Sequence, residues 1–386
     1  MVVAQSAELV KQMANKDLSS RLYRCSCLFV LFFVAAAASF NGYYDKWQLV
    51  DIDLLQGSPQ GVNNFKSMVD GTGERPFVYR QLLPMVANWI DRQVPEQTKD
   101  RLFTAKIHSG KLFREYMFRS PVAQERAYFF RYWIVYALVF LFVWISVYAM
   151  YILCKSVGSP PATAAAAAII MILLMPYFLT VGGYFYDYPE LAFLALAVWM
   201  ALNLDWWWMI PLVALATWNK ESFLLFSPSL YPLLRQRGSR ISALFGTGLL
   251  GLTCAVVYGV LRLRFQNNPG RTVYMELGYQ VNFALHYANS FFWEKNYGVI
   301  AIKASNPLVM ALIAWTVWRG WRYLPRVIQR HAMIAAVINF PLFILFCAPG
   351  ELRDLSFLYV TFVLVIAANL KDWAVGSARS ESRITT

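Results

Sequence analysis

The chain has little charge for its size. Of its 386 residues, 15% are charged and 58% are hydrophobic, and the mean hydropathy is +0.43. A soluble domain cannot bury so large a share of apolar side chains, and several apolar runs reach the roughly 20 residues that cross a bilayer core. Short alternating segments, typical of a transmembrane barrel, are missing. The composition therefore predicts an all-α, polytopic membrane protein.

Several catalytic and ligand-binding signatures are also missing. The three histidines are scattered, the five cysteines have no zinc spacing, and the sequence contains no HExxH or serine-hydrolase pattern. It contains no P-loop and no dinucleotide-binding fingerprint. The net charge of +13 suits anionic lipid headgroups or phosphates, and nothing resembles a nucleic-acid-binding module. Because the basic turns between apolar runs are short, we expect any chemistry to face outward.

Hydrophobic runs and basic residues together predict the topology. The N-terminal segment 1–24 is basic and lacks a signal-peptide pattern, so we expect an amphipathic cytoplasmic segment there. A single transmembrane domain is expected over 25–370, with external loops at 43–128 and 262–298, followed by a cytoplasmic tail, 371–386. About ten membrane segments are predicted, at 25–42, 129–154, 162–181, 191–204, 206–218, 223–234, 241–261, 299–318, 332–348 and 355–370.

Two parts of this scheme depart from simple crossings. The segments 206–218 and 223–234 are short, so they are interpreted as a re-entrant hairpin or as two abbreviated spans. Lys220 and Glu221 at their junction are interpreted as a mutually neutralised ion pair. In the first external loop, 79–90 and 100–118 carry apolar residues at helical spacing. These are predicted to be amphipathic helices that lie along the interface.

Acidic residues follow the first apolar run at once. Asp45 comes directly after it, and Asp51 and Asp53 form an acid pair with one residue between them. Such carboxylates can act as a general base or bind a divalent cation. The alternative is a solvated loop in which one acid caps a helix. These three residues are the candidate catalytic acids, and a divalent cation as cofactor stays open.

A basic and aromatic block closes the same stretch. Arg75, Tyr79 and Arg80 place two guanidinium groups beside aromatic rings. Arginine forks match phosphate oxygens, and rings suit sugars or prenyl chains. The alternative role for the block is an interfacial anchor.

Three later turns also carry charges, and the predicted topology places all of them on the outer side. Asp187 and Glu190 have the spacing of a capping box for the helix 191–204. Lys220 and Glu221 occupy the junction described above. Glu351 and Arg353 belong to a short charged turn, for which a solvated surface turn is the simpler interpretation.

These features together resemble the GT-C superfamily of membrane glycosyltransferases. In particular, the chain resembles bacterial multi-span proteins with a YDYPEL turn, an N-[KR]-E-[ST] turn and a late GE-x-R turn. The matching residues here are Tyr186–Leu191, Asn219–Ser222 and Gly350–Arg353. The resemblance implies a GT-C-like helical bundle in the bacterial inner membrane.

The resemblance also implies a function. A sugar would pass from a polyprenyl-phosphate donor to a lipid or glycan acceptor on the external face. By position, the base would be Asp45, with Asp51 and Asp53 as competitors, although Asp45 is followed by Lys46 and not by a second acid. The remaining charged residues would bind substrate, with Arg75, Arg80 and Lys220 on the lipid phosphate.

Two other classes of function fit the same sequence. Charged residues within the membrane and broken helices also serve a transporter or flippase for a lipid-linked or anionic solute. A non-catalytic membrane assembly subunit is the third possibility. The chain shows no clear inverted repeat, which counts modestly against a transporter.

Overall fold

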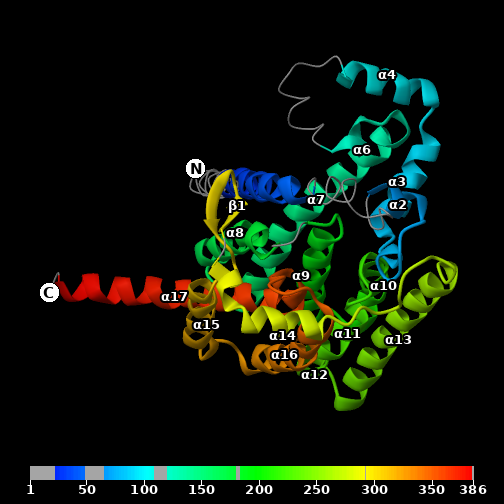
Figure 1. Cartoon of the computed structure of the whole chain (residues 1–386). Helices are drawn as coiled ribbons and strands as arrows, with labels where there is room; N and C mark the ends of the chain where they lie inside the picture. The colour runs from blue at the N-terminus through cyan, green and yellow to red at the C-terminus, as the bar shows by residue number, and fades with distance from the viewer. Residues whose placement is uncertain (1–21, 48–64, 108–119, 180–182, 292, 385–386) are drawn as a thin grey trace, which may run out of the picture.

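The computed structural model describes residues 22–47, 65–107, 120–179, 183–291 and 293–384 (Figure 1). These residues are almost entirely helical, which confirms the all-α prediction. Asp51, Asp53 and most of the predicted cytoplasmic segment 1–24 lie outside the described residues.

Six helical runs are long and apolar enough to cross a membrane, which indicates a multi-pass integral membrane protein. The last of them joins the 3₁₀ helix η5 (Leu352–Leu358) to the start of α17 (Tyr359–Ile384). The six are Leu22–Trp47, α7 (Arg126–Ser156), α8 (Pro161–Phe178), α13 (Arg240–Arg264), α16 (Arg326–Phe346) and Leu352–Val375.

The other predicted segments are shorter than a full crossing. Helix α9 (Asp187–Asn203) has 17 residues, α10 (Met209–Asn219) has 11 and α15 (Pro307–Trp321) has 15. A 3₁₀ turn, η2 (Trp206–Trp208), precedes α10. After α10, the chain returns through α11 (Phe223–Phe226), the 3₁₀ helix η3 (Ser227–Leu230) and α12 (Tyr231–Arg237). The first predicted short piece is therefore one short helix, and the second is divided into α11, η3 and α12.

The predicted segment 299–318 is wrong at its start. Residues Val299–Ile302 form strand β2, which pairs antiparallel with β1 (Trp293–Asn296). Tyr297 and Gly298 connect the strands with φ values of 53° and 80°, as a tight hairpin turn requires. Helix α15 begins only at Pro307, after Asn306, whose side chain accepts a hydrogen bond from the Leu308 amide at 3.0 Å.

The first loop contains α2 (Phe65–Asp70), the 3₁₀ helix η1 (Phe77–Tyr79), α3 (Leu82–Gln93), α4 (Glu96–Ile107) and α6 (Pro121–Gln124). Helix α3 is amphipathic, as predicted for 79–90, because it buries Leu82, Leu83 and Ala87 and exposes Arg92 and Gln93. Helix α4 begins earlier than predicted for 100–118, and the part of that prediction after Ile107 lies outside the described residues.

The bundle has two chemically different ends. At one end, Arg237 donates to the Leu202 carbonyl, and Arg319 pairs with Asp372 at 3.2 Å. Lys155, Arg240 and Arg326 lie at helix termini of this same end, which we call the basic end. The opposite end gathers the start of α9 with the ends of α10 and α16, and we call it the site end.

Differences in helix length shape the site end. Helix α9 packs against α7 and α10, and α10 packs against α13; twelve of the 17 residues of α9 are buried, and Figure 1 shows it inside the bundle. At about 1.5 Å per residue, α9 spans about 25 Å and α10 about 16 Å, against about 46 Å for α7 and about 37 Å for α13. The short helices therefore end among longer ones and leave a recess.

Candidate functional site

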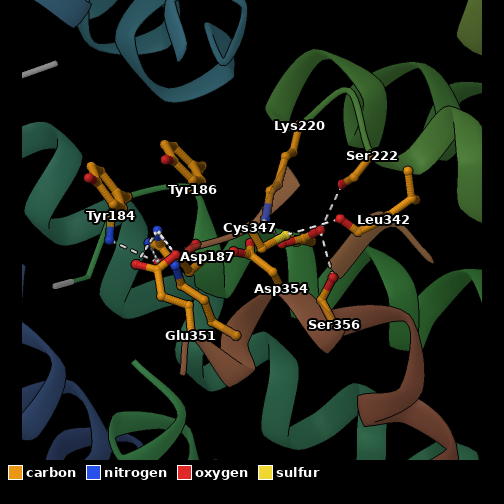
Figure 2. Close-up of polar contacts among 12 residues, drawn as sticks. Tyr184, Tyr186, Asp187, Lys220, Ser222, Leu342, Cys347, Glu351, Asp354 and Ser356 are labelled. Atoms are coloured by element: carbon orange, nitrogen blue, oxygen red, sulfur yellow. Dashed lines mark hydrogen bonds and ion pairs between the residues drawn. The ribbon is translucent and has the colours of Figure 1, made fainter. Parts of the chain in front are cut away.

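Buried charged side chains from four parts of the chain meet in this recess. Figure 2 shows residues of the α9 start, the α10–α11 junction and η5 pointing toward one another. Burial is nearly complete: Asp187, Glu190, Lys220 and Glu351 are each 6% exposed or less. The set, called here the charge cluster, comprises Arg80, Asp187, Glu190, Lys220, Glu221, Glu351, Arg353 and Asp354.

Glu190 is the centre of the charge cluster. Its carboxylate accepts from Lys220 Nζ at 2.7 Å, from Ser222 Oγ at 2.8 Å and from Ser356 Oγ at 3.0 Å. Lys220 Nζ also lies 3.7 Å from Asp354. One carboxylate thus connects α9, the α10–α11 junction and η5. Because its acceptor positions are occupied, Glu190 serves to hold Lys220 in place.

The predicted ion pair between Lys220 and Glu221 is wrong. Glu221 pairs instead with Arg80, whose Nη2 lies 2.9 Å from Glu221 Oε1 and whose Nε donates to Oε2 at 3.3 Å. The two neighbours therefore have partners in different parts of the chain, Lys220 in Glu190 and Glu221 in Arg80. Burial alone would raise the pKa of Glu221, but the charge of Arg80 and its hydrogen bonds outweigh burial and hold that pKa below its ordinary value.

Arg80 is fixed by aromatic rings as well as by Glu221. Its guanidinium lies 4.4 Å from the ring centre of Tyr186 and 5.1 Å from that of Phe77, and it also donates to the Tyr186 hydroxyl. Stacked and forked contacts of this kind leave an arginine little freedom. Arg80 is therefore a preorganised cation at the wall of the recess.

Arg353 joins the two remaining acids. Its Nη2 donates to both oxygens of Glu351, at 3.2 and 3.1 Å, and its Nη1 lies 3.5 Å from Asp187 Oδ2. The guanidinium lies 4.6 Å from the centre of the Tyr184 ring. Its Nε is buried without a hydrogen-bond partner among the described residues. An unpaired guanidinium N–H of this kind is a ready donor for an anion.

The capping box predicted at Asp187 and Glu190 is wrong. The N-cap of α9 is Tyr186, and no side chain caps it. Asp187 Oδ2 accepts from the Tyr184 amide at 2.9 Å, while Glu190 turns to Lys220. Buried cations nearby bind these acids more strongly than exposed backbone amides would, because charge-assisted bonds gain strength away from water.

Glu351 titrates close to neutral pH. Burial raises the pKa of its carboxyl to about 7, and the neighbouring Arg353 offsets only part of this rise. The turn that carries it is thus buried, not the solvated turn that its sequence favoured. A carboxyl with a pKa near the working pH is well placed to accept and return protons.

The charge cluster opens into a cavity of about 940 Å³. Its lining is partly charged and partly apolar, so the cavity is amphiphilic. The charged lining residues include Arg80, Lys220, Glu221, Glu351, Arg353 and Asp354. The apolar lining residues, called here the apolar wall, include Leu225, Tyr258, Val273, Leu342, Phe346 and Phe357.

The structure separates the other predicted residues from this cavity. Asp45 lies in the last turn of Leu22–Trp47, not in a loop, and its Oδ2 is 3.8 Å from Lys295 Nζ of β1. Arg75 gives both terminal nitrogens to backbone carbonyls, those of Gln266 and Gly270. Tyr79 is buried against Tyr258. Of the basic and aromatic block, Arg80 is the residue that lines the cavity.

Five polar residues of the site were not among the predicted site residues. Tyr184, Tyr186, Ser222 and Asp354 lie in or beside the turns that carry the resemblance, so their position was the available signal. Ser356 had no sequence signal, because its role depends on η5 folding back over α9. Among the described residues, no group of three or more His, Cys, Asp or Glu is arranged to hold a metal ion.

The sequence and the structure were compared with protein-family models, with curated proteins and with solved structures, and none of them matches.

The pairing pattern predicts which substitutions are coupled. Replacing Lys220 by Met, or Glu190 by Gln, leaves a partner without its counter-charge, at a cost of about 3–5 kcal/mol for a buried pair. The double variant should lose less free energy of unfolding than the two single variants lose together, by at least about 1 kcal/mol. Equilibrium unfolding in mixed detergent micelles gives the four free energies of unfolding.

Glu221 provides the matched control for this cycle. Lys220→Met combined with Glu221→Gln should be nearly additive, because Glu221 pairs with Arg80. Equal coupling of Lys220 to both acids would contradict the described pairing.

The raised pKa of Glu351 predicts a protonation change near neutral pH. The infrared C=O stretch of a protonated carboxyl should disappear as pH rises from 6 to 8. Because the folded state holds this proton above the ordinary pKa of glutamate, stability should also decline with rising pH between about 4.5 and 7. Both effects should vanish in Glu351→Gln and persist in Glu221→Gln, and a signal unchanged by Glu351→Gln would disprove the assignment.

Proposed function

We propose that this protein is a membrane transferase that acts on a lipid-linked phosphate donor at the site end of the bundle. The observation that carries this proposal is the amphiphilic cavity, whose lining combines Arg80, Lys220 and Arg353 with large apolar side chains. A polyprenyl-phosphate sugar has the matching chemistry, since it combines an anionic head with a hydrocarbon chain. The GT-C resemblance supports sugar as the transferred group and a lipid or glycan as the acceptor.

The proposed reaction is an inverting displacement. Glu351 accepts the proton of the acceptor hydroxyl while the acceptor oxygen bonds to the anomeric carbon of the sugar. The bond from that carbon to the phosphate oxygen breaks, and the lipid phosphate leaves with the electron pair. Arg353, Lys220 and Arg80 stabilise the departing phosphate.

The contact between Glu351 and Arg353 would couple the two halves of this reaction. Arg353 Nη2 binds both oxygens of Glu351, and its buried Nε is unpaired. When Glu351 takes up the proton, it loses its negative charge and its hold on Arg353 weakens. At the same moment the lipid phosphate gains charge, so the guanidinium becomes more available where it is needed. Asp45, Asp51 and Asp53 remain the competing candidates for the base.

The orientation is part of the proposal. Short loops rich in Lys and Arg stay on the cytoplasmic side, and here they are at the basic end. The site end, and the reaction, would then face outward, with the N-terminus in the cytoplasm. The resemblance favours the inner membrane of a bacterium.

One observation favours a transporter as the second candidate. Transporters bind substrate where helices are interrupted within the membrane, and Lys220 lies at the interruption between α10 and α11. A transporter would need the charge cluster for binding but would leave the donor intact. The two functions therefore differ in whether the bond between the sugar and the phosphate is broken.

An assay with defined donors tests the proposal. Protein in nanodiscs is incubated with polyprenyl-phosphate mannose, glucose or arabinose and with a heat-treated extract of bacterial lipids and glycans that supplies acceptors, and the release of free polyprenyl phosphate is measured. Glu351→Gln should lower the rate by about 10²–10⁴, because proton transfer is lost. Arg353→Lys should also reduce it strongly, since the charge stays and the fork is lost.

Two controls complete this assay. Asp205 lies at the basic end and is well exposed, so Asp205→Asn should leave the rate unchanged. Asp45→Asn tests the competing base. Loss of release with Asp45→Asn and full activity with Glu351→Gln would refute the role of Glu351. Binding of intact donor, without release by the wild-type protein, would favour the transporter.

A further inference from the structure

A second part of the site end has a different character. Between Arg271 and Glu294 the sequence contains one charged residue, Glu276. The structure forms α14 (Leu277–Leu285), η4 (Tyr287–Phe291) and the β1–β2 hairpin here. Many large apolar side chains of this part are at least 41% exposed: Val273, Met275, Leu277, Tyr279, Val281, Leu285, Tyr287, Phe291, Trp293, Val299 and Ile300. We call residues 272–302 the interfacial segment.

The interfacial segment neither crosses a membrane nor is buried by the rest of the chain. Helix α14 has nine residues and is about 14 Å long, roughly half of what a crossing needs. All nine residues are partly or fully exposed. Exposed apolar surface of this extent marks a contact with lipid or with another protein.

Hydrogen bonds fix the depth of α14. The Glu276 amide donates to the Leu345 carbonyl at 2.8 Å, and Gln280 Nε2 donates to the carbonyls of Phe343 and Cys347. These acceptors form the last turn of α16, a membrane-crossing helix. Helix α14 therefore lies where α16 leaves the hydrocarbon core.

The hairpin is fixed at a similar depth. The Tyr297 hydroxyl donates to the Leu173 carbonyl in the C-terminal part of α8, at 2.7 Å. Glu294 pairs with Lys46, at the end of the first crossing helix, at 2.6 Å. Both parts of the interfacial segment are thus tied to the ends of crossing helices at the site end.

We propose that the interfacial segment inserts into the headgroup and upper acyl region of the leaflet at the site end. The occupant of its apolar surface is membrane lipid. Its depth places it at the boundary, and its aromatic residues, Tyr279, Tyr287 and Trp293 among them, are the types that concentrate there. Between Arg271 and Glu294 the scarcity of charge lowers the cost of insertion that lysine or glutamate would impose. Glu294 and Lys295 of β1 are paired with Lys46 and Asp45.

The insertion would also place the mouth of the cavity at the lipid boundary. Val273, Tyr274 and Glu276 line the cavity and continue directly into α14. A lipid head could then enter the cavity while its hydrocarbon chain stays in the leaflet. This consequence rests on the proposed function, but the insertion itself does not.

Spin-label accessibility tests the insertion without reference to activity. Cys25, Cys27 and Cys347 are replaced by Ser, while Cys154 and Cys254 stay because they are buried. Single labels are attached to Tyr279→Cys, Leu285→Cys or Ile300→Cys in vesicles of phosphatidylcholine and phosphatidylglycerol. Gln236→Cys, an exposed position at the basic end, is the matched control. Elution as a single symmetric peak in gel filtration confirms that each variant folds.

Oxygen concentrates in lipid and a nickel chelate in water, so the two relaxants report the surroundings of each label. The three labels should collide several-fold more with oxygen than with the chelate, and the control label should show the reverse. Dominant chelate collisions at all three positions would overturn the proposal, because they indicate water. Protection from both relaxants would also overturn it, because the surface would then be covered by protein, such as a second copy of this chain.

Discussion

The ion pair between Glu190 and Lys220 is the contact on which the site depends. A lone ammonium or carboxylate in this recess would be costly, and each makes the other tolerable there. Ser222 and Ser356 complete the hydrogen bonding of Glu190. The pair thereby fixes the start of α9, the α10–α11 junction and η5 relative to one another. It exists because α9 and α10 end among longer helices, which leaves room for polar groups inside an otherwise apolar bundle.

The charge balance of the cluster bears on what the cavity can bind. Five acids (Asp187, Glu190, Glu221, Glu351 and Asp354) face three bases (Arg80, Lys220 and Arg353), so the formal charge is −5 + 3 = −2. An anion would be opposed by this excess unless a proton entered with it. Glu351, with a pKa raised to about 7, is the group that can take up this proton. Donor binding would then favour the protonated carboxyl, whereas the transfer step needs the carboxylate, so this proton must leave Glu351 before the acceptor hydroxyl reacts.

The sequence predicted the helical class and most crossings, because a run of some 20 apolar residues has few other uses. It also identified charged turns at Asp187, Lys220 and Glu351, because charges between apolar runs stand out. It could not give their partners, since Lys220 binds an acid 30 residues away and Glu221 binds Arg80 across the fold. Asp45 was placed in a loop, but Tyr43, Tyr44 and Trp47 are buried, and their packing prolongs the first helix past it. The start of segment 299–318 was taken as helical because Val299–Ile302 is apolar, which a strand accommodates equally well.

The position of a bound lipid phosphate tests the account most directly. A cryo-electron microscopy structure in nanodiscs with saturating polyprenyl phosphate would locate the headgroup. The account predicts the phosphate in the cavity, within hydrogen-bond distance of Arg353 and of Lys220 or Arg80, with the hydrocarbon chain along the apolar wall. A phosphate located beside Asp45 and Lys295, with the charge cluster unchanged, would contradict it.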